Sequence, residues 1–452
     1  MTNPLIALAN EAATWQSRPM SDTTRHHARR ALVDWFAALL PGCLRPPATL
    51  LAKALAAERG TGRAICYVDG RASPLRHAAL INAAASHTIE FDDIHRDSGY
   101  HPGSPVISAA LAAAQSRDAS LDTLLRAMVA GYDVSSRIGL AVQPSHYRMW
   151  HITGTVGTFG AAVATAHVLG CGPTEMAHAI ATAATMAGGL QQAFRGDGMS
   201  KPMHPGHAAD AGTLAALAAS AGVTGALDVL DGPVGFAAAT SEDRGKWDLA
   251  LEGLGVVQPI EAITFKNHGC CGHIFAALDA ISALKLEHRF TADDVESIHV
   301  EGYAATKDIC DRPVATTEQE ARFSVQYCTA ALLLLGGVRI AAFTPEHLAD
   351  PAIRRQMAKV TVAMAPDLAA SYPSRRAARV AIRLADGRQL DRYQPTRKGD
   401  PDAPLSDAEL SEKFLELTTP VIGARAHDLL DTLWTGDTLP GAIPLTPMAL
   451  AG

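Results

Sequence analysis

TTRHHARRALVDWFAALL, residues 23–40, sets the pattern for the first half of this chain. Its apolar residues return at helical spacing, and the Ala and Leu that fill it favour helices. Gly and Pro in LPGCLRPP (40–47) separate it from the next segment. Similar segments lie at 105–115, 121–131, 157–169, 174–187 and 208–221. Because small Ala side chains let helices pack closely, residues 1 to about 265 are predicted to form a mainly α domain.

The pattern changes to strands from about residue 290. DVESIHVEGY (294–303) and KVTVAMA (359–365) are rich in β-branched residues. ARVAIRLADGRQLDRY (378–393) is typical of a hairpin that turns at Asp386-Gly387. Helical segments such as 319–336 lie between these strands, so this region is predicted to form a smaller α+β domain.

Helical signals return near the end of the chain. Ser406 and Glu409 have the spacing of a capping box before AELSEKFLEL. This last segment is expected to pack back on the first domain, which would make the α+β domain an insertion. The expected fold class is therefore mainly α.

Composition narrows the function classes. The 452 residues have a net charge of -7 with Lys and Arg scattered, so no nucleic-acid partner is expected. MTNPLIALANEAATW at the N-terminus lacks the basic region of a signal peptide, and runs such as YCTAALLLLGG (327–337) are too short to span a bilayer. A cytoplasmic protein that does not cross a membrane is expected. The seven cysteines have no disulfide-like spacing, which predicts reduced thiols.

Two segments raise questions of cofactor and metal binding. GTVGTFGAA (154–162) has GxxGxxG spacing and no preceding strand, so close helix packing explains its glycines better than a dinucleotide site. EFDDIHRDSGYHPGSP (90–105) and KPMHPGHAAD (201–210) offer possible metal ligands at Asp92, Asp93, His95, His101, His204 and His207. No HExxH, CxxC pair or EF-hand loop accompanies them, and no GxSxG elbow marks a serine nucleophile. Neither a metal nor a cofactor is expected.

Acid/base chemistry without a metal fits the histidines better. Four separate segments place a histidine beside Gly, Pro or another polar residue: YHPG (100–103), MWHITGT (149–155), SKPMHPGH (200–207) and NHGCCGH (267–273). Histidine titrates near neutral pH and can give or take a proton. Lys201 could hold a carboxylate or stabilise a developing enolate. These residues alone do not identify a reaction.

Taken together and in order, these segments resemble the MmgE/PrpD family. The matching pieces are EFDDIH…HPGSPVISAALA (90–112), AGYDVSSRIG (130–139), WHITGTVGTFGAA (150–162), SKPMHPGHAADAG (200–212), TGALDVLDGPVGF (224–236), FKNHGCCGHIFAALDA (265–280), ARFSVQY (321–327) and KGDPDAPLS (398–406). The family includes 2-methylcitrate dehydratases, cis-aconitate decarboxylases and iminodisuccinate epimerase. The resemblance implies a large all-helical domain, residues 1–267 and 399–452, with an inserted α+β lid domain, residues 268–398. It also implies a homodimer without cofactor.

The resemblance assigns roles residue by residue. The family's active-site histidines fall on His101, His151 and His273, and its lysine falls on Lys201. Its supporting or substrate-binding positions fall on Glu90, Asp93, His204 and Tyr327. Within the acidic segment, Asp93 is expected to orient a histidine or the lysine, while His95 and Asp97 are expected to lie in a solvated loop.

The implied reaction is proton transfer at a carbon next to a carboxylate of a small di- or tricarboxylate. A dehydratase of the 2-methylcitrate type is the first expectation. An epimerase of the iminodisuccinate type and a cis-aconitate-type decarboxylase are the alternatives, followed by a carboxylate-binding member without activity. Ile94 stands where dehydratase and decarboxylase members often have Thr, which puts their substrates in doubt.

Overall fold

Two units make up the chain in the computed structural model, which describes residues 3–194, 198–372 and 374–446. Unit 1 comprises Met1–Thr264 and Ser406–Gly452, and unit 2 comprises Phe265–Leu405. Helices dominate the fold and the sheets are small, which confirms the expected mainly α class.

Unit 1 is built almost entirely of helices. They are α1 (Pro4–Thr14), α2 (Asp22–Gly42), α3 (Ala48–Ala54), α4 (Leu75–Thr88), α5 (Gly103–Arg117), α6 (Leu121–Val142), α7 (Ile152–Val168), α8 (Pro173–Ala184), α9 (Ser200–Ser220), α10 (Phe236–Thr240), α11 (Trp247–Leu251), α19 (Asp407–Ile422) and α20 (Arg425–Thr435). Two short antiparallel pairs accompany them, β1 (Ala64–Cys66) with β2 (Arg71–Ser73) and β3 (Ile94–His95) with β4 (Ile263–Thr264).

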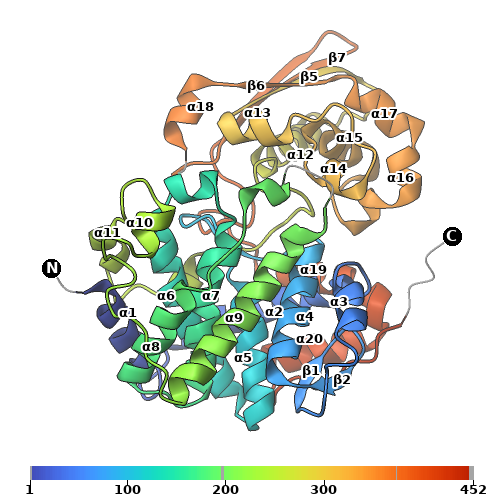
Figure 1. Ribbon diagram of the computed structural model, residues 1–452. Coiled ribbons are helices and arrows are strands. Elements are labelled where there is room, and N and C mark those ends of the chain that lie inside the picture. Colours follow the sequence, from blue (N-terminus) through green and yellow to red (C-terminus); the bar gives the residue numbers. More distant parts are fainter. Residues whose placement is uncertain (1–2, 195–197, 373, 447–452) are drawn as a thin grey trace. The chain divides into compact units, whose positions relative to one another are not determined.

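Helix α7 lies in the core of unit 1, where it packs on α5, α6, α8 and α9 (Figure 1). Its glycines permit this closeness. A Cβ on Gly157 would lie 2.6 Å from Pro105 Cγ, and one on Gly160 would lie 2.6 Å from Val106 Cγ2. The expected role of these glycines in helix packing is confirmed.

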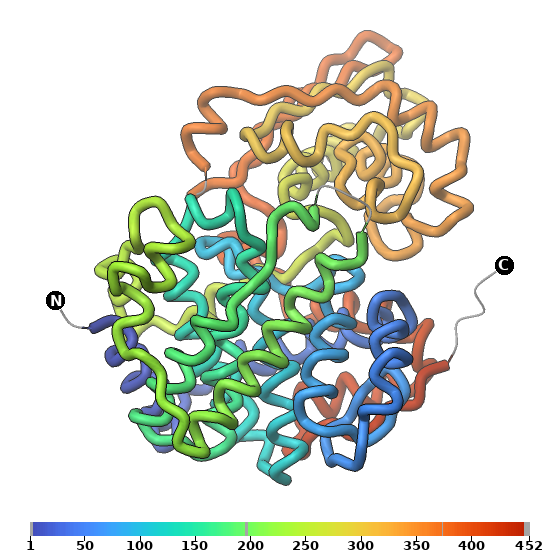
Figure 2. Tube along the Cα trace, viewed as in Figure 1, coloured from blue at the N-terminus to red at the C-terminus, as the bar shows by residue number. Residues whose placement is uncertain are grey.

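The two ends of the chain meet within unit 1. Figure 2 shows the red C-terminal helices beside the blue N-terminal ones, and α19 packs on α2. Buried Lys413 of α19 donates to Asp34 Oδ1 at 2.6 Å and to the carbonyl of Phe91 at 2.9 Å. The capping box of Ser406 and Glu409 at the start of α19 is confirmed.

Unit 2 contains a four-stranded sheet in the order β6 (Val360–Met364), β5 (Val295–Gly302), β7 (Ala378–Leu384) and β8 (Gln389–Gln394). In this sheet β5 and β6 pair in parallel, whereas β5 with β7 and β7 with β8 pair antiparallel. The expected hairpin is confirmed, with Gly387 in the left-handed region at φ +90°. The elements are α12 (Phe275–His288), β5 (Val295–Gly302), α13 (Ala304–Cys310), α14 (Glu318–Arg322), α15 (Val325–Leu335), α16 (Pro345–Ala349), α17 (Pro351–Met357), β6 (Val360–Met364), α18 (Pro366–Ser371), β7 (Ala378–Leu384) and β8 (Gln389–Gln394).

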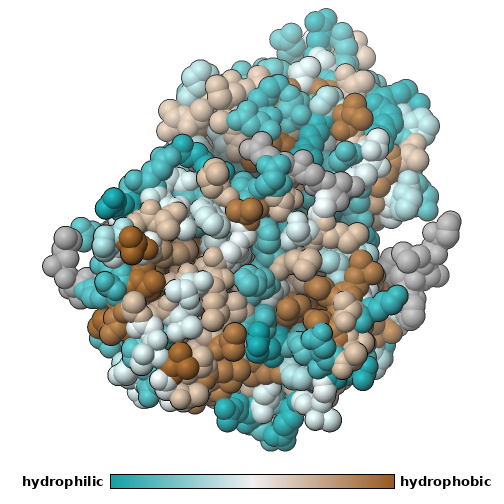
Figure 3. Space-filling view, viewed as in Figure 1, coloured by the Kyte–Doolittle hydropathy of each residue, from teal (hydrophilic) through white to brown (hydrophobic). Residues whose placement is uncertain are grey.

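The surface and the cysteines agree with the composition. Figure 3 shows hydrophilic and hydrophobic side chains interspersed on the visible face. Within the described ranges, no helix is both long and apolar enough to cross a bilayer. All seven cysteines are buried thiols rather than disulfides, as expected.

Candidate active site

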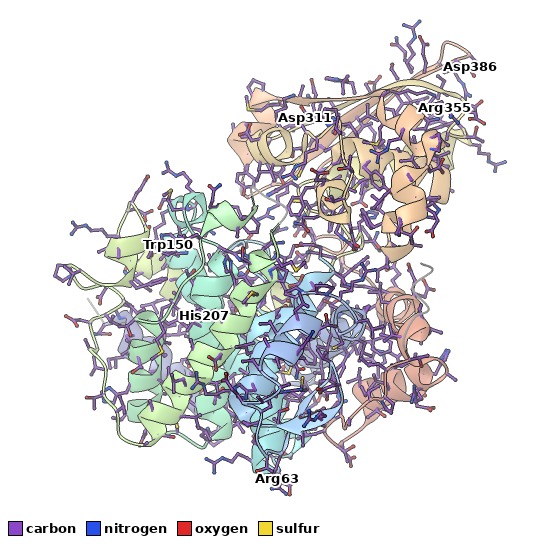
Figure 4. The ribbon with its side chains drawn as sticks, turned by 45° about the vertical axis from the view of Figure 1, so that its right-hand side comes forward. Arg63, Trp150, His207, Asp311, Arg355 and Asp386 are labelled. Atoms are coloured by element: carbon purple, nitrogen blue, oxygen red, sulfur yellow. The ribbon has the colours of Figure 1, made fainter. Side chains whose placement is uncertain are left out.

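Helix ends bring the candidate side chains of unit 1 together. His87 lies in the last turn of α4, and His101 lies two residues before α5. His151 is the N-cap residue of α7, while Lys201 and His204 lie in the first turns of α9. Figure 4 labels two sequence neighbours of these residues, Trp150 before His151 and His207 after His204. Interactions between these side chains divide them into three groups.

The first group is a buried ion pair. Lys201 Nζ donates to Glu90 Oε1, and both residues are only 4% exposed. The Lys201 ammonium also lies 5.2 Å from the centroid of the Phe194 ring. Glu90 has φ +57°, a conformation that residues other than glycine rarely adopt and that is concentrated at functional sites. Glu90, a predicted supporting residue, therefore contacts the predicted active-site lysine directly.

The second group is centred on Asp92, which is 1% exposed. Its Oδ2 atom lies 2.6 Å from His87 Nδ1 and 3.3 Å from His101 Nδ1. The hydroxyl of Ser104 donates to the same oxygen at 3.1 Å. One carboxylate oxygen therefore faces two imidazoles and a hydroxyl.

The third group is a pair of histidines. His151 Nδ1 lies 2.9 Å from His204 Nδ1, so one of these atoms must donate and the other accept. The His151 ring also lies 5.6 Å from the His87 ring, whose centroid is 4.9 Å from that of His101. Four imidazoles thus form a continuous cluster, which we call the histidine cluster: His87, His101, His151 and His204.

Burial keeps most of this cluster uncharged at neutral pH. It lowers the pKa of His87 to about 3 and that of His204 to about 4, and it lowers the pKa of His151 well below its ordinary value. Neighbouring histidines add smaller effects in the same direction. A neutral imidazole has one donor and one acceptor nitrogen, so the cluster can pass protons without repelling Lys201.

Asp93 contacts the start of α5 and a tyrosine of α6. Its carboxyl group accepts hydrogen bonds from the backbone N–H of Gly103 at 2.8 Å and from the hydroxyl of Tyr132 at 2.7 Å. Burial, with the charge of Asp34, raises the pKa of Asp93 to about 8. Asp93 was expected to orient a histidine or the lysine, and its described contacts instead hold the start of α5, just after His101.

Two of the expected site residues belong to unit 2. His273 Nδ1 lies 2.7 Å from the hydroxyl of Tyr303, whose ring stacks on Tyr372 with the centroids 4.6 Å apart. Burial and the charges of two nearby arginines, Arg376 and Arg397, lower the pKa of His273 well below its ordinary value. Tyr327 is fully buried, and its hydroxyl donates to the carbonyl of Ala342 at 2.6 Å.

The sequence interpretation missed His87 and left Asp92 out of the expected acid/base site. The sequence did contain a signal for His87, because this residue lies only three positions before Glu90, where the acidic segment begins. The solvated-loop expectation was wrong for His95, which is buried in β3 with its Nδ1 2.8 Å from Ser98 Oγ. Pairing of β3 with β4 carries it inside, whereas Asp97 is exposed as expected.

One set of atoms could also bind a metal. The ligand atoms of His87, Asp92 and His101 all lie within 4.8 Å of one another. Two imidazole nitrogens and a carboxylate oxygen are ligands that zinc and other divalent ions accept. The same atoms are equally able to hydrogen-bond to one another, as the 2.6 Å contact between His87 and Asp92 shows.

Comparisons with known proteins extend these findings. The family description MmgE/PrpD N-terminal domain matches residues 6–247, and MmgE/PrpD C-terminal domain matches residues 268–435. A cis-aconitate decarboxylase-like protein of Aspergillus oryzae is 27% identical, over 87% of this chain and 86% of its own length. Cis-aconitate decarboxylases of Homo sapiens and Aspergillus terreus are 28% and 26% identical, over 75% and 98% of this chain and 72% and 96% of their own lengths.

Proposed function

Because the chain belongs to the MmgE/PrpD family, we propose that it is a lyase that decarboxylates a small tricarboxylate of the cis-aconitate type without a metal. The buried Lys201–Glu90 pair beside the histidine cluster is the observation that carries this proposal. The names of the relatives favour decarboxylation over the dehydration that the sequence first suggested.

Binding would begin at Lys201. Its buried ammonium can hold a carboxylate of the substrate, and such a charge acts strongly where water is excluded. A substrate with three negative charges would also raise the pKa of nearby histidines, because opposite charges favour the protonated imidazole. Substrate binding would therefore favour proton uptake by His87, His151 and His204, which burial keeps neutral in the free protein.

The chemical step depends on this placement. The bond between a carbon and one carboxylate breaks, CO₂ leaves, and the electron pair moves into the adjacent unsaturated acid. Lys201 stabilises the developing negative charge, and His101 or His151 places a proton on carbon. Elimination of water would use the same proton-transfer groups on a hydroxylated acid, so a dehydratase stays an alternative.

An epimerase is the second candidate because of the His151–His204 pair. Two imidazoles with their Nδ1 atoms 2.9 Å apart can relay a proton away from carbon and return one. Reprotonation on the opposite face would invert the centre without loss of a group.

The test uses the full chain with four acids in D₂O: cis-aconitate, 2-methylcitrate, citrate and iminodisuccinate. Proton NMR should show cis-aconitate consumed with deuterium in the product, and carbon NMR should show the CO₂ released. Deuterium exchange into iminodisuccinate without net loss would favour the epimerase, and loss of water from 2-methylcitrate would favour the dehydratase. Absence of exchange and turnover with all four acids would contradict the substrate class.

Roles for unit 2 are proposed from the family resemblance. We expect His273 to donate or accept the second proton, so His273→Gln should lower kcat by about 10²-fold or more. Tyr327 stays a predicted supporting residue, although its hydroxyl already donates to Ala342. The lid function of this unit and the homodimer likewise stay predictions.

A further inference from the structure

Asp92 has an anchored oxygen that no part of the proposed reaction uses. The residue is 1% exposed, and its Oδ2 atom faces His87 Nδ1 at 2.6 Å and the Ser104 hydroxyl at 3.1 Å. These contacts come from the end of α4 and the start of α5. The position of the carboxylate is therefore fixed from two helices before any substrate binds.

His87 completes this arrangement without reaching solvent. Its side chain is fully buried, and no described residue hydrogen-bonds to its Nε2 atom. An ionised Asp92 can only accept hydrogen bonds, which would place the proton of this contact on His87 Nδ1. Because His87 is neutral, it can hold Asp92 while adding no positive charge beside His101.

We propose that the His87–Asp92 pair is a positioning device for His101, keeping the His101 proton on Nδ1 and its lone pair on Nε2. This inference rests on the proposed proton-transfer function. His101 Nδ1 lies 3.3 Å from Asp92 Oδ2 without hydrogen-bond geometry. Catalytic contacts of this kind are often long in the free enzyme and shorten in the complex with the substrate or the transition state. Asp92 would then stabilise the protonated His101, as a carboxylate does for the histidine of a catalytic triad.

A metal site would require a different protonation state of the same residues. A bound ion would need a lone pair on one ring nitrogen of each histidine and on a carboxylate oxygen of Asp92. The Oδ2 atom of Asp92 already receives the Ser104 hydroxyl, and its distance to His87 is that of a hydrogen bond. Hydrogen bonding therefore explains the geometry without a further component.

Paired variants separate positioning from direct proton transfer. Asparagine places an amide N–H near the position of the imidazole Nδ1–H, so His87→Asn should keep the bond to Asp92 and stay within about 3-fold of wild-type kcat. His87→Ala and Asp92→Asn should lower kcat by about 10²-fold or more with little change in KM. His299→Asn, on the exposed side of unit 2, is the matched control and should have wild-type rates. Thermal denaturation checks that each variant is folded.

A second readout does not depend on turnover. Nitrogen NMR of histidine-labelled protein should show His101 protonated on Nδ1 in the wild type and in His87→Asn, with this signature lost in Asp92→Asn. His101 protonated on Nε2 in the wild type would overturn the proposal. His87→Asn as slow as His87→Ala, with the His101 tautomer unchanged, would also overturn it, because His87 would then act through its own Nε2. Metal bound stoichiometrically and removed by EDTA with a change in these signals would do the same.

The two proposals fail separately. If the wild type turns over none of the four acids while its His101 tautomer is as expected, the proposed function is wrong. If turnover is found but Asp92→Asn keeps wild-type kcat, the positioning device is wrong and the function stands.

Discussion

At the scale of single residues, Lys201 and Glu90 form the buried ion pair that is proposed to bind the substrate. Each needs the other, because removing one partner of a buried pair leaves an uncompensated charge and costs about 3–5 kcal/mol. Loss of activity in a single variant would therefore confound chemistry with folding. A test of Lys201 has to neutralise both partners.

We predict that Lys201→Met combined with Glu90→Gln keeps the free energy of unfolding near wild type and lowers kcat by about 10²-fold or more. The neutral pair leaves no isolated buried charge, but it can no longer hold a carboxylate or stabilise negative charge. Urea unfolding and turnover of the active acid measure the two effects. Near-wild-type kcat in the double variant would exclude the role of Lys201.

Asp93 gives a prediction for pH. Its pKa is about 8 in the folded protein against an ordinary value of 3.8, so its stabilising contribution is complete below about pH 4 and is lost as the pH rises through 8. Asp93→Asn imitates the protonated acid. The Tm of Asp93→Asn minus that of wild type should therefore increase from pH 5 to pH 9.

The exposed Asp97 provides the control for this experiment. Asp97→Asn removes a carboxylate from an exposed position beside Arg96, so a pH trend that both variants share does not come from the burial of Asp93. Buried histidines such as His87 have the opposite effect, because their contribution to the stability of the fold is lost as the pH falls below 6.5. Subtracting the wild-type Tm at each pH removes this effect. A pH-independent difference for Asp93→Asn would contradict the raised pKa.

At the scale of helices, the site depends on how closely α5 and α7 approach. Both helices begin next to site residues, α5 after His101 and α7 after His151. Gly157 lies against Pro105 at this contact, so the spacing of the two histidines is set partly by a residue that has no chemistry of its own.

We predict that Gly157→Ala lowers the free energy of unfolding by about 1–3 kcal/mol, the usual cost of overpacking a core. The added methyl group would lie 2.6 Å from Pro105 Cγ, so the helices must separate and kcat should fall as well. Chemical denaturation and kinetics measure both. Gly60→Ala, where an added Cβ meets nothing within 4 Å, should be close to neutral.

At the scale of the whole chain, the C-terminal segment is part of the core of unit 1. Lys413 reaches Asp34 and the backbone of Phe91, which directly follows Glu90. Residues more than three hundred positions apart thus fix the segment that carries Glu90, Asp92 and Asp93.

We predict that Lys413→Met destabilises the protein by about 3–5 kcal/mol, because Asp34 would stay buried without this cation. Adding Asp34→Asn should restore most of that loss. Urea unfolding of the single and double variants measures it. Equal stability of Lys413→Met and wild type would show that this contact does not stabilise the fold.

Local patterns in the sequence determined the element types. Helical periodicity, the capping box at Ser406 and the Asp386-Gly387 turn depend on neighbours a few residues away, so they could be interpreted from the chain alone. The ordered motifs also determined the family, together with Glu90, His101, His151, Lys201 and His204 as candidate residues.

Only the tertiary structure decided which partners these residues have. His87 and Asp92 joined the candidate site because the ends of α4 and α5 meet, and His95 became buried because β3 pairs with β4. The hydroxyl of Tyr327 donates to a backbone carbonyl, and the carboxyl group of Asp93 accepts from a backbone N–H at the start of α5. Contacts between distant segments decide which groups form hydrogen bonds, and the exclusion of water by burial shifts their pKa values. The spacing of residues along the chain encodes neither of these effects.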